Sequence, residues 1–481
     1  MSSAAHASGE RAARDIAMQV IARVVNLALG VLVTALVART LGTAGYGEWA
    51  TILAVLTLVG FFASFGMESV AIREAAREPD TEHEWLGAVM LLRLYLLIPV
   101  VVLSAVAVVL LHRNEQMLIA GLILVVTMPF NGVGALQLVF QLRVNNLVPM
   151  LVLTLRSVLW TIAVAIIYWS GGNMIALAIA LTVTNAIGSV VQAVAALRAA
   201  PRRPRPSRQR IGVLVRHGLP IGLSGVLVIV YARIDQLIVF SLKGSESAGL
   251  YGSVYNVLDQ AHFIPISILT TLAPIMAASW PTNRARLLRT ARLSAEAMAV
   301  ASFGALAFVI VAASPLIQLF YGAEFAAAAP ALPILGGAFI FICFGYLNDN
   351  LLVIMGLQKR RLLVSLIALV VNVVGNLIVV PFAGFLGAAW MTLGTEVLVC
   401  AASLWLILRG LEMSLPPPGR LGRTLIAAIL LGFALDAIKL AGAPLAVLVV
   451  AACAAYPVLL FALRAMSIDD VRVLLRREAL A

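Results

Sequence analysis

The sequence predicts an all-α, polytopic membrane protein, and three observations support that prediction. Hydrophobic residues make up 62% of the 481-residue chain and charged residues only 12%, against about a quarter in soluble domains. The apolar stretches run for about 20 residues or more, the length that a helix needs to cross a bilayer. Basic residues are alternately abundant and scarce from one connecting loop to the next. We therefore expect helices and not a β-barrel, whose strands would be alternating segments of about ten residues.

The apolar stretches predict about fourteen transmembrane helices. The first six are expected at Ile16–Ala38, Ala50–Ile72, Leu86–Leu111, Gln116–Leu138, Pro149–Trp169 and Ile175–Leu197. The segment Arg198–Gly212 is polar and proline-rich, which is typical of a linker. Six more are expected at Val213–Phe240, Tyr251–Ala278, Arg292–Ala313, Ala328–Asn350, Leu362–Pro381 and Phe385–Leu408. Two final helices, at about Arg423–Lys439 and Pro444–Leu463, follow a loop that contains Pro416–Pro418.

The basic residues support this map, since cytoplasmic loops carry an excess of arginine and lysine. Alternate loops counted from the N-terminus hold 26 basic residues, and the opposite loops hold only Arg39, Arg113, Lys243 and Lys439. Both termini are then expected in the cytoplasm. The net charge of +12 is explained by this topology and does not indicate nucleic-acid binding. The three cysteines lie in apolar stretches, have no metal-binding spacing and are expected to be buried.

A faint internal repeat predicts two lobes. Tyr46-Gly47 opens the second helix as Tyr251-Gly252 opens the eighth, and Phe140–Arg143 precedes the fifth as Leu357–Arg360 precedes the eleventh. Because six helices separate equivalent positions, the lobes would have the same orientation and a parallel pseudo-two-fold relation. We expect a six-helix lobe at 1–200, a basic linker at 201–212, a second lobe at 213–410, and two extra helices with a tail at 411–481. Chance enrichment of glycine and tyrosine at membrane interfaces is the alternative explanation.

The same motifs resemble a known family, over roughly residues 15 to 410. Leu41-Gly42, Tyr46-Gly47, Phe65-Gly66 and Ile72-Arg73-Glu74, then Leu319–Gly322, Asn372, Asn376 and Gly387–Ala389 are similar to oligosaccharide and polysaccharide flippases of the multidrug/oligosaccharidyl-lipid/polysaccharide exporter superfamily. The resemblance implies a bundle of two lobes that moves lipid-linked sugars across the bacterial inner membrane by alternating access. Two helices beyond the twelve of many relatives leave the subfamily open.

Arginines inside the expected helices are candidate substrate ligands. Arg23, Arg93 and Arg156 each lie about seven residues above the cytoplasmic start of a helix, roughly 10 Å deep. Three guanidinium groups at one level would form a cationic shelf for a pyrophosphate, which guanidinium groups bind bidentately. Asn26 shares a polar face of the first helix with Arg23. Snorkelling of each arginine to the lipid headgroups is the alternative.

A second group of polar residues is expected near the outer side of the second lobe. It comprises Arg233, a further candidate ligand, and Asp235, Asp259 and His262, which are candidates for a gate or an ion-coupling site. Arg233 with Asp259 is the expected pair, either as a structural ion pair or as a gate that exchanges partners.

Other polar residues carry weaker signals. Asn372 and Asn376 favour hydrogen bonds between helices over substrate contacts. Glu396 and Asp436 are candidate coupling carboxylates, and Asn348–Asn350 favours a helix cap. The basic linker favours an anchor to anionic membrane lipids.

The sequence therefore predicts a flippase for a polyprenyl-pyrophosphate-linked oligosaccharide or related glycolipid, with no cofactor and no catalytic residues. The absence of a G-x-x-x-x-G-K-[ST] motif leaves an ion gradient of H⁺ or Na⁺, the membrane potential or product consumption as the driving force. Partners would be the lipid-linked substrate, membrane lipids, and polysaccharide polymerases or glycosyltransferases. A multidrug exporter of the same superfamily is one alternative, although four intramembrane arginines do not suit organic cations. A membrane glycosyltransferase or polymerase is another, but the short outer loops leave little room for a catalytic site.

Overall fold

The computed structural model describes residues 2–63, 66–132, 136–142, 147–200, 202–412 and 419–467. Among these residues there are helices and turns and no strand. Ten helices, counted within the described part of the chain, are long and apolar enough to cross a membrane. Phe65, Arg143, Pro416–Pro418 and the tail after residue 467, which the sequence interpretation used, lie outside the described residues.

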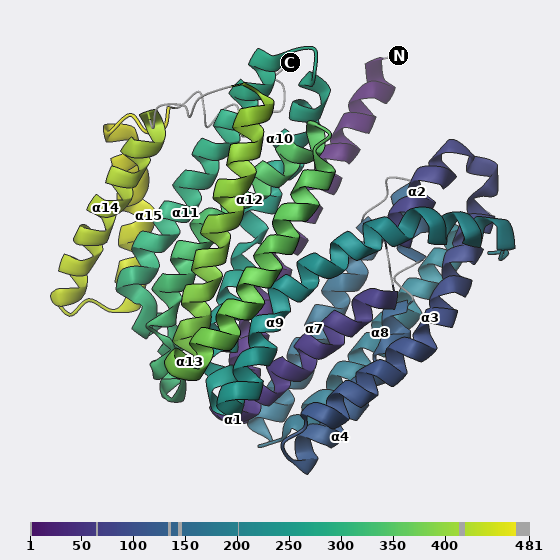
Figure 1. Ribbon diagram of the computed structural model, residues 1–481, viewed down its shortest axis with the longest axis horizontal. Coiled ribbons are helices and arrows are strands. Elements are labelled where there is room, and N and C mark those ends of the chain that lie inside the picture. Colours follow the sequence, from purple (N-terminus) through teal and green to yellow (C-terminus); the bar gives the residue numbers. More distant parts are fainter. Residues whose placement is uncertain are drawn as a thin grey trace. The chain divides into compact units, whose positions relative to one another are not determined.

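The chain forms two compact units, residues 1–241 and 242–481 (Figure 1). These units are defined by packing, whereas the lobes predicted at 1–200 and 213–410 are defined by the repeat and stay a prediction.

The first unit is built from α-helices that lie side by side. They are α1 (Ser2–Gly60), α2 (Met67–Arg77), α3 (Glu82–Leu111), α4 (Glu115–Val125), α5 (Met128–Gly132), α6 (Gln137–Leu142), α7 (Leu147–Trp169), α8 (Met174–Ala199) and the first part of α9 (Arg208–Ala261). Two of these starts are visible in the sequence, because Asn114 and Asn173 accept hydrogen bonds from the backbone N–H groups of Met117 and Ala176 and cap α4 and α8. The short α5 and α6 replace the end of the predicted span Gln116–Leu138.

The second unit contains the remaining part of α9 and six further α-helices. These are α10 (Phe263–Ser279), α11 (Arg284–Tyr321), α12 (Ala331–Ile354), α13 (Gln358–Gly410), α14 (Gly419–Leu440) and α15 (Leu445–Ala462). Helix α11 has 38 residues and extends beyond both ends of the span predicted at Arg292–Ala313. Asn283 caps its start by accepting a hydrogen bond from the Arg286 N–H at 3.0 Å.

Glycines divide three of the long helices into two segments each. Gly42 in α1, Gly244 in α9 and Gly384 in α13 have φ values of 68°, 83° and 58°, a region that favours glycine. The three positions separate predicted helices one from two, seven from eight, and eleven from twelve. Gly42 and Gly244 also share the same ψ to within a degree, −177° and −176°. This matched pair of kinks agrees with the predicted repeat, while the total of fourteen helices stays a prediction.

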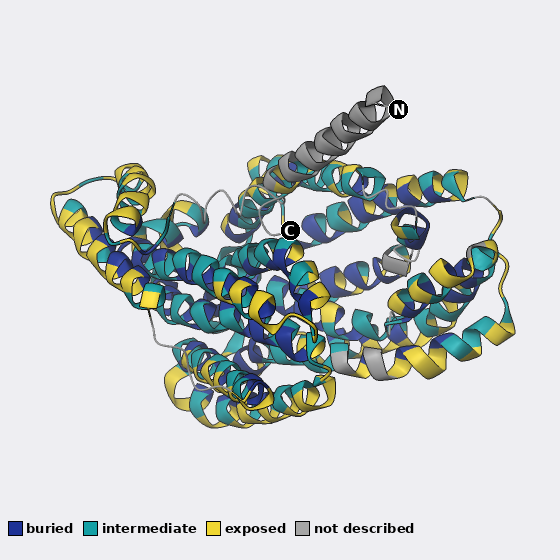
Figure 2. Ribbon diagram, turned by 90° about the horizontal axis from the view of Figure 1, so that it is seen from above, coloured by how far each residue is buried: buried dark blue, intermediate teal, exposed yellow. Residues whose placement is uncertain are grey.

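The exposed faces are strongly apolar, as expected where lipid is the solvent. Figure 2 shows exposed and buried residues sharing the same helices in both units. Large side chains such as Ile98, Trp169 and Phe382 are exposed to 69%, 79% and 89%. Cys453 is also exposed, so the expectation that all three cysteines are buried is wrong for this residue of α15.

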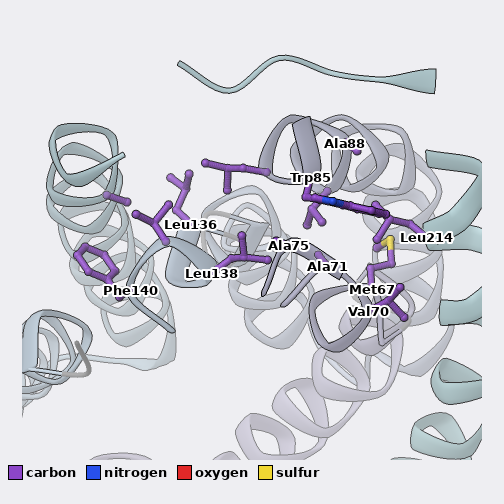
Figure 3. Close-up of a cluster of buried hydrophobic side chains, with 14 residues drawn as sticks. Met67, Val70, Ala71, Ala75, Trp85, Ala88, Leu136, Leu138, Phe140 and Leu214 are labelled. Atoms are coloured by element: carbon purple, nitrogen blue, oxygen red, sulfur yellow. The ribbon is translucent and has the colours of Figure 1, made fainter. Parts of the chain in front are cut away.

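One hydrophobic core of the first unit joins α2, α3, α6, α8 and α9 (Figure 3). Its members are Met67, Val70, Ala71, Ala75, Trp85, Leu86, Ala88, Val89, Leu136, Leu138, Val139, Phe140, Ala196 and Leu214. The second unit has a core between α11, α14 and α15, which contains Val311, Leu431 and Leu448. Within the second unit, α14 and α15 are thus packed against α11.

The basic linker is held against the first unit by Arg210. Its guanidinium group lies 4.7 Å from the ring of Trp85 and forms ion pairs with Glu78 at 2.8 Å and Glu84 at 3.2 Å. Burial lowers the pKa of Arg210, but the hydrogen bonds to Glu84 and Glu78 outweigh it and raise the pKa above its ordinary value. The Arg205 N–H donates to the His83 carbonyl at 3.0 Å. At least one end of the linker is therefore docked on protein.

Candidate functional site

Arg93, one of the predicted cationic ligands, is paired with an acid. Its side chain is only 10% exposed and forms an ion pair and hydrogen bond with Glu68 of α2. A charge in the membrane region usually has such a partner, because an unpaired charge there is costly. Arg93 is therefore compensated by a carboxylate of the neighbouring helix.

Arg156 has a different environment. Its guanidinium group donates to the Asn185 side-chain oxygen of α8, and Asn185 in turn donates to the Leu181 carbonyl at 2.8 Å. Within the described part of the chain, Arg156 has no carboxylate partner. Its stem crosses Gly188, where a Cβ atom would come within 2.1 Å and 2.2 Å of the arginine Cγ and Cδ atoms. Arg156 is thus a positive charge held by a neutral amide and by close packing.

A cavity of about 270 Å³ lies beside Arg156, wholly within the first unit. Its polar lining is Arg156, Gln137 of α6 and Gln192 of α8, and the other lining residues belong to α7. Gln192 is 6% exposed, and its side-chain nitrogen has no hydrogen-bond partner. Three hydrogen-bonding side chains therefore line one small cavity between α6, α7 and α8.

Arg23 and Asn26 both lie on α1. Arg23 is exposed. The Asn26 amide nitrogen donates to the Ala22 carbonyl at 2.7 Å and to the Thr154 hydroxyl of α7 at 2.8 Å. Thr154 is two residues from Arg156. Helix α7 therefore contacts α1 through Thr154 and α8 through Arg156. Arg93 and Arg156 face different helices, and a shelf shared by all three arginines stays a prediction.

The candidates on α9 fall into both units. Arg233 is half-buried and Asp235 is buried at 3% exposure, both in the first unit. The neighbouring Gln236 amide donates to the Thr51 hydroxyl of α1 at 3.4 Å. Asp259 belongs to the second unit, so the expected pair with Arg233 stays a prediction.

His262 lies between α9 and α10 in the second unit and contacts an aromatic ring. Its ring centroid is 6.0 Å from that of Tyr346 of α12, in a T-shaped arrangement. Tyr346 also lines a cavity of about 530 Å³ between α10 and α12. The structure thus places His262 beside a tyrosine of this cavity.

The asparagines of α13 form hydrogen bonds, as their spacing favours. Asn372 donates to Thr395 at 3.3 Å, and Asn376 donates to Asn372 at 3.2 Å. Because Gly384 separates the two segments of α13, the Asn372–Thr395 bond joins one segment to the other.

Asn348 and Asp349 lie inside α12, so the prediction that they form a helix cap is wrong. Asn348 donates to the Cys400 carbonyl at 3.2 Å, and Asp349 pairs with Arg361 at 2.8 Å. These side chains bind α13 instead of their own helix end.

Sequence reasoning missed Glu68, Asn185 and Gln192. Glu68 lies within the predicted second span, but nothing in its spacing showed that it would meet Arg93, 25 residues later. Asn185, Ser189 and Gln192 follow the four- and three-residue spacing that identified the polar face of the first helix. The same periodicity test applied to the sixth predicted helix could have found them.

Comparisons with known proteins give a family and a fold. The family model described as polysaccharide biosynthesis protein matches residues 12–280. Among curated proteins, none matches the sequence. The lipid II flippase MurJ, in an inward closed conformation, aligns with 95% of this chain and 99% of its own chain, with 14% identity and a TM-score of 0.74.

Two transporters of the MOP superfamily are also similar over most of their length. An inward-facing multidrug resistance MATE family transporter of the MOP superfamily is 18% identical, over 81% of this chain and 94% of its own, with a TM-score of 0.66. A MOP superfamily transporter from Pyrococcus furiosus is 16% identical, over 85% of this chain and 96% of its own, with a TM-score of 0.60. At these identities the likeness shows the fold alone, and it confirms the predicted fold class.

Proposed function

The chain belongs to the polysaccharide biosynthesis protein family, and on that premise we propose that it is a flippase for a lipid-linked oligosaccharide. The cargo is a polyprenyl-pyrophosphate-linked oligosaccharide or a related glycolipid. It moves from the cytoplasmic to the periplasmic leaflet of the bacterial inner membrane, with both termini of the chain in the cytoplasm. The protein acts as a transporter and not as an enzyme.

The observation that carries this proposal is Arg156. A guanidinium group inside a membrane helix, held by the neutral Asn185 and by no carboxylate of the described residues, leaves a positive charge to be balanced. A phosphorylated cargo supplies the missing negative charge, because guanidinium groups bind phosphate oxygens bidentately. Arg93, whose charge is already balanced by Glu68, supports this assignment less strongly.

The remaining candidates keep the roles proposed for them. Arg23 and Asn26 on α1, with Arg233 on α9, are the further cargo ligands. Asp235 in the first unit, and Asp259 and His262 in the second, are the candidates for a gate or for ion coupling, in which H⁺ or Na⁺ would be bound and released during alternating access. The partners are the lipid-linked substrate and, in the export pathway, polymerases or glycosyltransferases.

A multidrug exporter is the second candidate. The likeness to a multidrug resistance MATE family transporter supports it, as does the aromatic ring of Tyr346, which lines a cavity in the second unit. An aromatic ring suits an organic cation. This candidate places the cargo in the second unit, whereas the flippase places the phosphate at Arg156 in the first.

Leaflet exchange in reconstituted vesicles separates the two candidates. Vesicles containing the protein receive either a fluorescent polyprenyl-pyrophosphate oligosaccharide or a fluorescent organic cation. The flippase account expects faster exchange of the glycolipid than in protein-free vesicles and no accelerated uptake of the cation. Arg23→Ala should slow the exchange if Arg23 touches the cargo, and a rate equal to that of wild type would remove Arg23 from the site. Cation uptake without glycolipid exchange would favour the exporter.

A further inference from the structure

We propose that the cavity between α6, α7 and α8 binds a phosphoryl group, with Arg156, Gln137 and Gln192 as its ligands. This inference rests on the proposed function, because that function identifies the lipid that carries the phosphate. It adds two ligands, Gln137 and Gln192, and a defined place in the first unit.

The charge in this cavity is positive and uncompensated. Among the described residues, Arg156 is the only charged member of the lining, and its guanidinium group donates to the neutral side chain of Asn185. Arg93, in contrast, is neutralised by Glu68. Because a charge removed from water needs a counter-charge, the cavity is selective for an anion.

The two glutamines supply further donors. The Gln192 side-chain nitrogen is buried without a hydrogen-bond partner, and the half-buried Gln137 presents a second amide to the same cavity. Buried donors are normally satisfied, so each exception calls for a partner that is absent from the protein itself. A phosphoryl group fits because its oxygens accept several hydrogen bonds at once.

Close packing fixes the arginine before the ligand arrives. Gly188 leaves no room for a methyl group beneath the Cγ and Cδ atoms of Arg156, and Asn185 is itself held by the Leu181 carbonyl. A ligand that meets a fixed donor loses less entropy on binding. Gly188 and Asn185 therefore act as positioning residues for Arg156.

Two lipids could present the same phosphoryl chemistry. One is the diphosphate of a polyprenyl carrier, which the proposed function requires, and the other is the headgroup of an anionic phospholipid. Leu153, which lines the cavity, is 51% exposed, so the cavity reaches the surface of the protein and a lipid has access to it. We assign the cavity to the diphosphate of the carrier.

Binding of a labelled short-chain polyprenyl diphosphate to the full-length protein in phosphatidylcholine nanodiscs tests this assignment. Gly188→Ala, which displaces the Arg156 stem, should weaken binding about tenfold, the effect of losing one charge-assisted hydrogen bond. Gly394→Ala is the matched control, because a Cβ atom there meets nothing within 4 Å, and it should bind as wild type does. Equal affinity of the Gly188→Ala variant and wild type would overturn the proposal.

A second variant, Gln192→Glu, distinguishes loss of binding from loss of folding. The new carboxylate would neutralise Arg156, so thermal stability should be kept or increased while diphosphate binding falls at least about tenfold. Unchanged diphosphate binding by this stable variant would contradict the assignment. A competition experiment compares phosphatidylglycerol with unlabelled diphosphate. Equally effective displacement of the labelled diphosphate by phosphatidylglycerol would assign the cavity to a phospholipid headgroup and would overturn the carrier assignment.

Leaflet exchange by the same wild-type preparation separates this inference from the proposed function. If wild type exchanges the glycolipid but all variants bind diphosphate equally well, the cavity assignment fails and the flippase stands. If wild type binds diphosphate in the cavity but exchanges no glycolipid, the flippase fails and the phosphoryl site stands.

Discussion

Replacing Arg210 with glutamine is expected to release the basic linker from the first unit. Its two ion pairs involve partly exposed carboxylates, and pairs of this kind contribute up to about 1 kcal/mol each. The contact of the guanidinium group with the ring of the buried Trp85, at 4.7 Å, adds about 0.5 to 2 kcal/mol. Because the three contacts share one guanidinium group they do not add fully, and we expect a total loss of about 1 to 2 kcal/mol.

Hydrogen exchange of the Arg205 amide measures this loss, since that N–H donates to His83 across the docked linker. A local destabilisation of about 1 to 2 kcal/mol corresponds to about 5- to 30-fold faster exchange. Arg208→Gln is the control, because Arg208 is exposed and makes no hydrogen bond or ion pair within the described chain. Unchanged protection in Arg210→Gln would refute the docking energy worked out above.

The pH dependence of this contact follows from the raised pKa of Arg210. A raised pKa in the folded state contributes stability that is complete below the ordinary value of the group and is lost only as the pH rises past the folded value. The guanidinium group is therefore fully charged between pH 7 and 10, and the ratio of exchange rates between variant and wild type should be constant there.

Three further predictions concern stability and are checked by unfolding in detergent. Glu68→Ala should cost about 1 to 2 kcal/mol, less than the 3 to 5 of a fully buried pair because Glu68 is 39% exposed, and a double-mutant cycle with Arg93→Ala should show coupling. Independent effects of the two changes would disprove the pair. Asn372→Ala should cost about 0.6 to 1.7 kcal/mol through the bond to Thr395, and a neutral result would mean that the bond contributes nothing. Phe140→Ala should cost about 3 to 5 kcal/mol because Phe140 is 3% exposed in the core of Figure 3, whereas a loss below 1 kcal/mol would show that the core collapses around the gap.

The fold class was predictable because lipid imposes a simple rule on sequence. Apolar length and the loop charges predicted the helices, and the glycines with Tyr46 and Tyr251 predicted a repeat, which stays a prediction beside the similar kinks at Gly42 and Gly244. The family resemblance read from those motifs is confirmed by the family match over residues 12–280. Helix ends were less predictable, because a helix such as α11 extends beyond its apolar stretch. Where such a helix begins depends on a capping residue, which is Asn283 in α11.

The site was predictable only as a list of charges in the membrane. Because burying a charge in the membrane is costly, Arg93 and Arg156 could be identified as residues that need partners. The partner of each arginine depends on which helix lies next to it. Glu68 and Asn185 are 25 and 29 residues away from the arginines they contact, and helical periodicity links residues only within one helix. The cap predicted at Asn348 failed for the same reason, since α13 provides its partner.

The most direct test of this account is the initial rate of leaflet exchange for a polyprenyl-pyrophosphate oligosaccharide in vesicles with wild type, with Arg156→Ala, or without protein. The account predicts that wild type accelerates exchange over protein-free vesicles and that Arg156→Ala loses at least about tenfold of that acceleration, the effect of one charged hydrogen bond. A wild-type rate equal to that of protein-free vesicles would contradict the flippase, and an undiminished rate in Arg156→Ala would contradict the role of the arginine.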